Sequence, residues 1–129
     1  MTKLTINADC GNAPKKLILR ELNIAFARAE VEAILKIFTD DIHWRIIGEA
    51  NLHGKETVRA ALEAMKDTVT TELTIHSIIT HGPEAAVNGI ITTEQGGPFA
   101  FCDVYRFTSA SGNKINAMTS YVIDLNDGE

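Results

Sequence analysis

Asp103 is the residue whose type and surroundings most favour chemistry. It lies in the strand-like run Pro98–Ser109, whose alternation places it on one face with Phe101, Tyr105 and Phe107. An apolar wall around a carboxyl group disfavours the anion and raises its pKa, which suits an acid, a base or a hydrogen-bond donor. The alternative is a structural role for Asp103, paired with an arginine or a backbone amide. The sequence leaves both open.

Further side chains are expected to line a cavity together with Asp103. Trp44 and Ile46 share one face of the strand-like segment Ile42–Ile47. Trp44 could stack on a flat ligand, with its indole N–H as a polar handle, or it could seal a core. The complete set that we predict to contact a ligand is Trp44, Ile46, Met65, Phe101, Tyr105, Phe107, Met118, Ser120 and Val122.

His53 is a second candidate for acid–base chemistry. It stands directly before Gly54, where the chain enters a helical segment. An imidazole at the mouth of a cavity could move protons near neutral pH. The alternative is a side chain that only satisfies backbone groups of the turn. We therefore name Asp103 and His53 as the catalytic candidates.

The sequence does not predict a metal or a cofactor. The histidines show no HxH or HExxH spacing, and Cys10 and Cys102 are far apart in the chain. A phosphate-binding loop, a dinucleotide fingerprint and a nucleophile elbow are also missing from the sequence. Any chemistry is therefore expected to proceed without a cofactor.

Hydrophobic periodicity places these residues on helices and strands. It predicts helices near residues 13–30, 31–38 and 55–67. After residue 67 the chain has β character, in four long runs joined by short turns: Thr70–His81, Glu84–Gln95, Pro98–Ser109 and Lys114–Leu125. We predict one α+β domain over residues 13–125 after a flexible segment, residues 1–12. Its helices should pack inside the concave face of a mixed, mainly antiparallel sheet.

Composition limits the partners of the chain. Its 129 residues suit one domain, and a formal net charge of −5 argues against nucleic acid and anionic membranes. An apolar run of the roughly 20 residues that span a bilayer is not found, nor is the apolar stretch of a signal peptide. We expect a cytoplasmic protein, a setting in which a disulfide between its two cysteines is not expected.

The second face of the last two strand-like runs is apolar as well. It carries Ala100, Cys102 and Val104 on one run and Ala117 and Thr119 on the next. A sheet with one solvent-exposed face shows a more regular alternation of polar and apolar residues. We therefore expect a second copy of the chain to cover this face in a homodimer.

The order of the elements resembles the nuclear-transport-factor-2-like superfamily, in its SnoaL-like and ketosteroid-isomerase-like branch. The resemblance extends from Lys16 to Asp124, and the phrases that carry it are Phe38–Asp41, Leu52–Glu56 and Cys102–Phe107 with Gly112 and Lys114-Ile115. It implies a cystatin-like fold, in which a strongly curved sheet wraps around three helices and forms a conical pocket.

The resemblance also implies catalytic positions that this sequence can be checked for. Ketosteroid isomerases use an aspartate base, together with a tyrosine and a protonated aspartic acid that polarise a carbonyl group. Here Ile46 falls at the position of the base and Leu22 at that of the tyrosine, and only Asp103 matches. The chain is therefore not expected to be a ketosteroid isomerase.

Three functions remain open from the sequence. The first is a SnoaL-like pocket protein that binds a small apolar metabolite, with the reaction, if any, unknown. The second is a cofactor-independent isomerase, cyclase or dehydratase in which Asp103 transfers a proton or polarises a carbonyl. The third is a non-catalytic, dimeric protein-interaction module.

Overall fold

The computed structural model of the chain describes residues 2–11 and 13–126. Within these residues the helices are α1 (Pro14–Ala27), α2 (Val31–Ile37) and α3 (Lys55–Ala64). The strands are β1 (Lys3–Ile6), β2 (Phe38–Ile46), β3 (Ala50–His53), β4 (Thr70–His81), β5 (Glu84–Thr93), β6 (Gly96–Phe107) and β7 (Ile115–Asp124).

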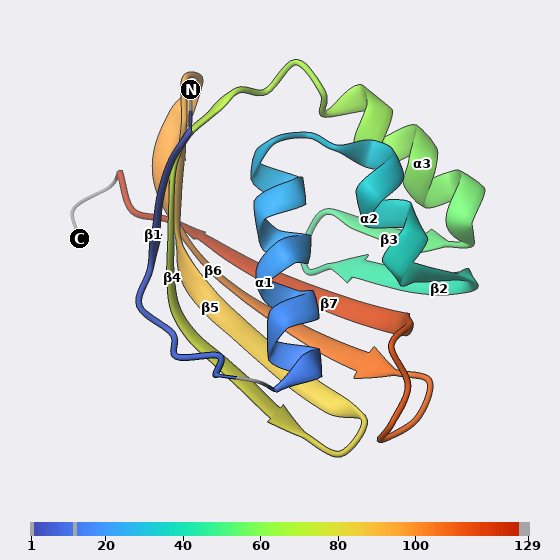
Figure 1. Cartoon of the computed structure of the whole chain (residues 1–129). Helices are drawn as coiled ribbons and strands as arrows, with labels where there is room; N and C mark the ends of the chain where they lie inside the picture. The colour runs from blue at the N-terminus through green and yellow to red at the C-terminus, as the bar shows by residue number, and fades with distance from the viewer. Residues whose placement is uncertain (1, 12, 127–129) are drawn as a thin grey trace.

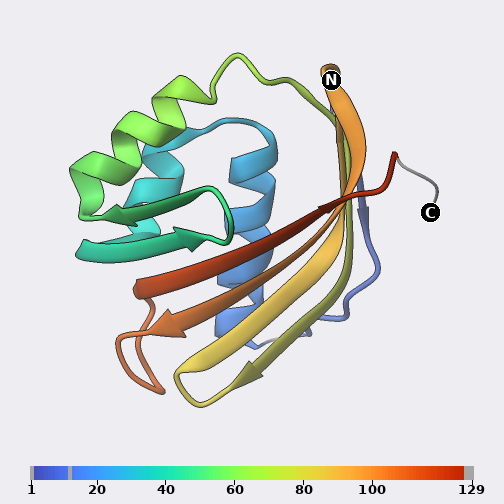
Figure 2. The ribbon, with the colours of Figure 1, turned by 180° about the vertical axis from the view of Figure 1, so that it is seen from behind.

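The seven strands form a single mixed sheet in the order β1-β4-β5-β6-β7-β2-β3. Neighbours pair antiparallel except β1 with β4 and β2 with β7, which pair in parallel. The sheet is strongly curved, and all three helices lie on its concave side, as Figures 1 and 2 show from opposite directions. The predicted α+β class, with helices inside a curved and mainly antiparallel sheet, is confirmed.

The bend of the sheet has a local cause in β4 and β5. The pairing of these strands shifts between Ile75 and Ser77, and the partner of Ile75 is Gly89. A Cβ atom added to Gly89 would lie 2.0 Å from the carbonyl oxygen of Thr74, so only glycine lets the two backbones approach this closely. Bulges and strand glycines are the usual means of bending a sheet. Here they create the hollow in which α1 and the site lie.

The hollow is filled by an apolar core at one end. Leu19 and Leu22 of α1 are fully buried, as are Phe38 of β2 and Ile115 of β7. Phe107 of β6 is 1% exposed and belongs to the same core. The core fixes α1 across the sheet at one end and leaves its other end to border a cavity.

All three helices end earlier in the chain than the hydrophobic pattern predicted. We predicted the first helix over residues 13–30, but α1 stops at Ala27 because Ala29 has a positive φ of 55°. The amide of Glu30 then donates to the carbonyl of Ala25, which closes the helix end. α2 and α3 are likewise shorter than predicted, ending at Ile37 and Ala64.

The N-terminal prediction is corrected by the structure. We expected a flexible segment over residues 1–12, yet Lys3–Ile6 forms strand β1 beside β4. The alternation of Leu4 and Ile6 with polar residues suits a half-buried edge strand. Residues 1 and 12 of that segment lie outside the described part of the chain.

Two further findings bear on the composition arguments. Among the described residues, no helix has the length and apolarity that crossing a membrane requires. Cys10 is buried and Cys102 half-buried, and both are free thiols.

Candidate functional site

An open cavity of about 300 Å³ lies between α1, the end of α3 and the concave face of the sheet. We call it the Asp103 cavity. Its floor consists of buried side chains: Asn23, Trp44, Leu73, Asp103, Met118 and Ser120. Its walls are half-buried and apolar: Phe26, Ile46, Ile91 and Phe101. Its mouth is marked by the exposed residues Glu49, Met65 and Val122.

The carboxyl group of Asp103 is held by two hydroxyl groups. The Tyr105 hydroxyl donates to Oδ2 of Asp103 at 3.3 Å. The Ser120 side chain, directly opposite Asp103 in the register of β6 and β7, forms a second hydrogen bond to the carboxyl. Among the described residues no arginine, lysine or histidine pairs with Asp103, so the structural arginine partner considered above is not found.

The hydrogen bonds continue from these hydroxyl groups into α1 and β2. Nδ2 of Asn23 donates to the Tyr105 hydroxyl at 3.2 Å and to the carbonyl of Leu19 at 2.9 Å. On the other side, Nε1 of Trp44 donates to Oγ of Ser120 at 2.9 Å. Besides its own strand β6, three elements of the fold, α1, β2 and β7, therefore hold the carboxyl of Asp103 in place.

Trp44 is held from two sides. Its indole N–H is bonded to Ser120, so it is not the free polar handle that the sequence suggested. The ring of Phe26 meets the indole edge-on, with centroids 5.5 Å apart and planes at 72°. Such a pair is a favourable aromatic arrangement. Trp44 thus lines the cavity as a fixed apolar surface.

Burial controls the protonation of the site. Loss of hydration raises the pKa of Asp103 to about 6, although the hydrogen bonds from Ser120 and Tyr105 act in the opposite direction. Burial, together with the nearby Asp103 charge, raises the pKa of Tyr105 well above its usual value. Tyr105 therefore stays a neutral donor, while Asp103 can take up or release a proton near neutral pH.

Most residues predicted from the sequence meet in this cavity. Those that line it are Trp44, Ile46, Met65, Phe101, Asp103, Met118, Ser120 and Val122. Tyr105 is 1% exposed and does not line it, although its hydroxyl reaches Asp103. Phe107 does not line it either, because it lies deeper in the core on the far side of Tyr105 along β6.

His53 lies outside the Asp103 cavity. It pairs with His43 across the β2–β3 hairpin, and the two rings stack with centroids 4.0 Å apart. His43 also contacts the side chain of Asn51 on the same hairpin. The strand β3, which the sequence analysis took for a turn, carries His53 along this hairpin and away from Asp103.

Several lining residues were not predicted from the sequence: Asn23, Phe26, Glu49, Leu73 and Ile91. Asn23 had a signal, because a polar residue stands in line with Leu19, Leu22 and Phe26 on one helical face. A polar side chain within an apolar stripe is unusual unless it has a buried partner. Glu49 lies in a turn between strands, and nothing in the sequence around it indicates that it borders a cavity.

A metal centre has no support from the arrangement of side chains. Within residues 2–11 and 13–126, no three or more of the histidine, cysteine, aspartate and glutamate side chains gather where they could hold an ion.

Comparison with known proteins places the chain among others of this architecture. A family model described as SnoaL-like domain matches residues 19–118. An NTF2-like protein of unknown function from Burkholderia xenovorans LB400 superposes with a TM-score of 0.75 at 16% identity, covering 94% of this chain and 91% of that one. No protein of curated function matches the sequence significantly.

Two other solved structures show the range of proteins with this fold. An NTF2-like protein of unknown function from Cytophaga hutchinsonii is 25% identical, with a TM-score of 0.64 over 84% of this chain and 99% of that one. An LEH-like epoxide hydrolase from M. tuberculosis is 14% identical, with a TM-score of 0.68 over 84% of this chain and 82% of that one.

The raised pKa of Asp103 predicts that the ionised carboxyl lowers the free energy of unfolding of the protein. Because the folded-state pKa of about 6 lies above the unfolded value of about 4, the folded protein binds more protons and loses stability as pH rises through this window. Asp103→Asn removes this loss. Its free energy of unfolding relative to wild type should be larger at about pH 7 than at about pH 4 by about 2 kcal/mol, as measured by urea unfolding.

The exposed Asp67 supplies the matched control. Asp67→Asn should change stability by less than about 0.5 kcal/mol at either pH, as is usual for surface positions. An Asp103→Asn variant with the same relative stability at both pH values would contradict a buried carboxyl with a raised pKa.

Proposed function

This chain belongs to the SnoaL-like domain family, and from that premise we propose that it binds a small, largely apolar molecule in the Asp103 cavity. One observation carries the proposal: a buried carboxyl group without a cationic partner among the described residues stands at the floor of an apolar cavity. A buried charge that lacks a partner in its own chain costs stability, and such groups are retained where a ligand uses them.

The shape of the cavity supports the same function. Its volume of about 300 Å³ is at the lower end of the range for ligand sites, which suits one ring with a short chain. The walls are apolar, and apart from Glu49 at the mouth the polar side chains lie at the floor. A ligand would therefore enter with its polar end first and leave its apolar part near Met65 and Val122.

Proton transfer at a carbonyl compound is a second candidate function. It is favoured by the pKa of about 6 for Asp103, because a group that titrates near the working pH is an efficient acid or base. The Asp103 carboxylate would take a proton from the carbon beside the carbonyl, giving an enolate, and return a proton to that molecule. Such a step would serve an isomerase, a cyclase or a dehydratase, and the step itself needs no cofactor.

The convex face of the sheet supports a homodimer as the working unit. No helix covers this face in the described part of the chain (Figures 1 and 2). Val104 is 44% exposed, Tyr121 48%, Ile79 61% and Ile123 63%. An exposed apolar patch of this kind commonly marks a protein interface. A second copy of the chain, seated sheet against sheet, would bury it.

Filling the cavity tests the binding function. Trp44 is the single tryptophan of the chain, so its fluorescence reports on a ligand in the cavity. We expect phenylbutanol, a neutral probe, to change this fluorescence on binding. Ile46→Phe adds bulk to the wall and should weaken binding about tenfold, or about 1.4 kcal/mol.

Ile47→Phe is the control, since Ile47 is the next residue and does not line the cavity. It should bind the probe as wild type does. Equal affinities for Ile46→Phe and wild type would contradict the assignment of the ligand to this cavity.

Deuterium exchange tests the catalytic candidate. In heavy water, the wild type should speed the exchange of hydrogens beside the carbonyl of phenylbutanone, as followed by proton NMR. Asp103→Asn and Asp103→Leu should both return exchange to the buffer rate, while Asn keeps part of the binding that Leu abolishes. Exchange that survives in Asp103→Asn would exclude Asp103 as the base.

A charge on the convex face tests the dimer. Val104→Glu should lower the mass measured by analytical ultracentrifugation at micromolar concentration from dimer to monomer. Val69→Glu is the control, because Val69 is similarly exposed at 43% but lies in the loop before β4. A wild type that is already monomeric would refute the interface.

A further inference from the structure

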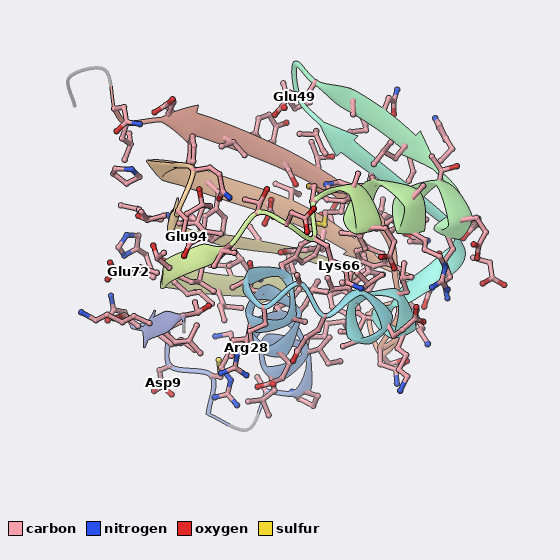
Figure 3. All side chains as sticks on the ribbon, turned by 90° about the horizontal axis from the view of Figure 1, so that it is seen from above. Asp9, Arg28, Glu49, Lys66, Glu72 and Glu94 are labelled. Atoms are coloured by element: carbon pink, nitrogen blue, oxygen red, sulfur yellow. The ribbon has the colours of Figure 1, made fainter. Side chains whose placement is uncertain are left out.

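The charged side chains that line the Asp103 cavity are both acidic. Asp103 stands at its floor and Glu49 at its mouth, and among the residues that the structure describes no lysine, arginine or histidine lines it. Figure 3 shows Glu49 at the tip of the β2–β3 hairpin, well apart from Arg28 and Lys66. These two basic residues line a different surface pocket. The lining side chains therefore carry negative charge and no positive charge when Asp103 is ionised.

The hydrogen-bond donors at the floor are already used within the protein. The Trp44 indole donates to Ser120, and the Tyr105 hydroxyl donates to Asp103. The two amide hydrogens of Asn23 go to Leu19 and Tyr105. Because the Leu19 carbonyl can only accept, the orientation of the Asn23 amide is fixed.

The groups left for a ligand are consequently acceptors. The first is Oδ1 of Asn23, for which the described residues supply no hydrogen-bond partner. The others are the Asp103 carboxyl oxygens, which keep free lone pairs beside the bonds from Tyr105 and Ser120. A ligand group that only accepts hydrogen bonds would find no donor at the floor while Asp103 is ionised. A group that donates, and above all one that also carries positive charge, would satisfy both.

The aromatic walls favour the same kind of ligand. Phe26, Trp44 and Phe101 present rings to the cavity. Aromatic side chains offer a large apolar contact area to the hydrocarbon part of an amine. A cation here would also give the buried Asp103 carboxylate an opposite charge, which the described residues do not supply at the site.

We propose that the Asp103 cavity binds an aliphatic or arylalkyl amine in its protonated form. The ammonium nitrogen donates to the carboxyl of Asp103 and to Oδ1 of Asn23, and the apolar part lies against Phe26, Trp44 and Phe101. Glu49 at the mouth attracts the cation as it approaches. The assignment rests on the proposed binding function and names its ligand class.

The selectivity expected from this site follows from charge. A carboxylate ligand would be repelled by Asp103 and Glu49 and would find no free donor at the floor. A neutral alcohol of the same shape can donate one hydrogen bond, but it leaves the buried charge of Asp103 without a counterion. An ammonium group is the one head group of the three that satisfies both requirements.

Three ligands that share one hydrocarbon skeleton and carry a positive, a neutral or a negative head group test the inference. Phenylbutylamine, phenylbutanol and phenylbutyrate would be titrated at about pH 7.5, where an alkylamine is protonated. The chemical shift of the Trp44 indole N–H is the readout. We expect the amine to bind at least about tenfold tighter than the alcohol, and the carboxylate not to bind.

Variants assign the preference to named residues. Asp103→Asn should bring the affinities of amine and alcohol to within about twofold of each other, because it removes the buried charge and keeps the shape. Glu49→Gln should reduce the preference less, since exposed charges are screened by water. Glu94→Gln is the control, because Glu94 is exposed and lies outside the cavity, and it should leave the series unchanged.

Each other outcome overturns a definite part of the account. If the alcohol binds as tightly as the amine, the inference fails while the cavity remains a binding site. If none of the three compounds moves the Trp44 signal, the proposed binding function fails as well. If the amine preference survives in Asp103→Asn, the carboxyl of Asp103 does not recognise the cation, and the inference fails.

Discussion

The carboxyl group of Asp103 is buried in an apolar hollow, and the groups that hold it are the neutral hydroxyls of Tyr105 and Ser120. Hydroxyl groups compensate only part of the hydration that a carboxylate loses on burial. The protein therefore keeps a charged group at a cost in stability. The two hydroxyls are in turn held by hydrogen bonds from other elements. Asn23 of α1 donates to the Tyr105 hydroxyl, and Trp44 of β2 donates to the Ser120 hydroxyl. The geometry of the site is thus prepared by the fold before any ligand arrives.

The hollow itself depends on the curvature of the sheet. Where β4 and β5 bend, Gly89 lets the strands approach so closely that even a methyl group would collide with the backbone of Thr74. In the curved sheet the core closes one end of α1, through Leu19 and Leu22, while Asn23 and Phe26 border the open space. Helix α1 therefore contributes Leu19 and Leu22 to the core and Asn23 and Phe26 to the site.

Much of this could be predicted from periodicity, and the exceptions have physical causes. β4 runs from Thr70 to His81 as predicted, and regular alternation along β6 correctly put Asp103 and Tyr105 on the inner face. Strict alternation would put Ile115 on the outer face with Ala117 and Thr119, but Ile115 is fully buried, because the pairing of β6 and β7 shifts between Arg106 and Phe107. Bulges leave no mark in a hydrophobic pattern. The role of Asn23 depends on a tertiary contact with Tyr105, 82 positions away, which a single helix does not reveal.

The central claim is that Asp103 is a buried carboxyl that is open to the cavity and for which the described residues supply no cationic partner. Carboxyl-carbon NMR of the isolated protein, titrated across the acidic and neutral range, tests it most directly. The account predicts that the Asp103 resonance titrates with a pKa of about 6, and that phenylbutylamine lowers this pKa because a bound ammonium stabilises the carboxylate. A resonance that titrates at about 4, the value of a solvated aspartate, with or without the amine, would contradict it.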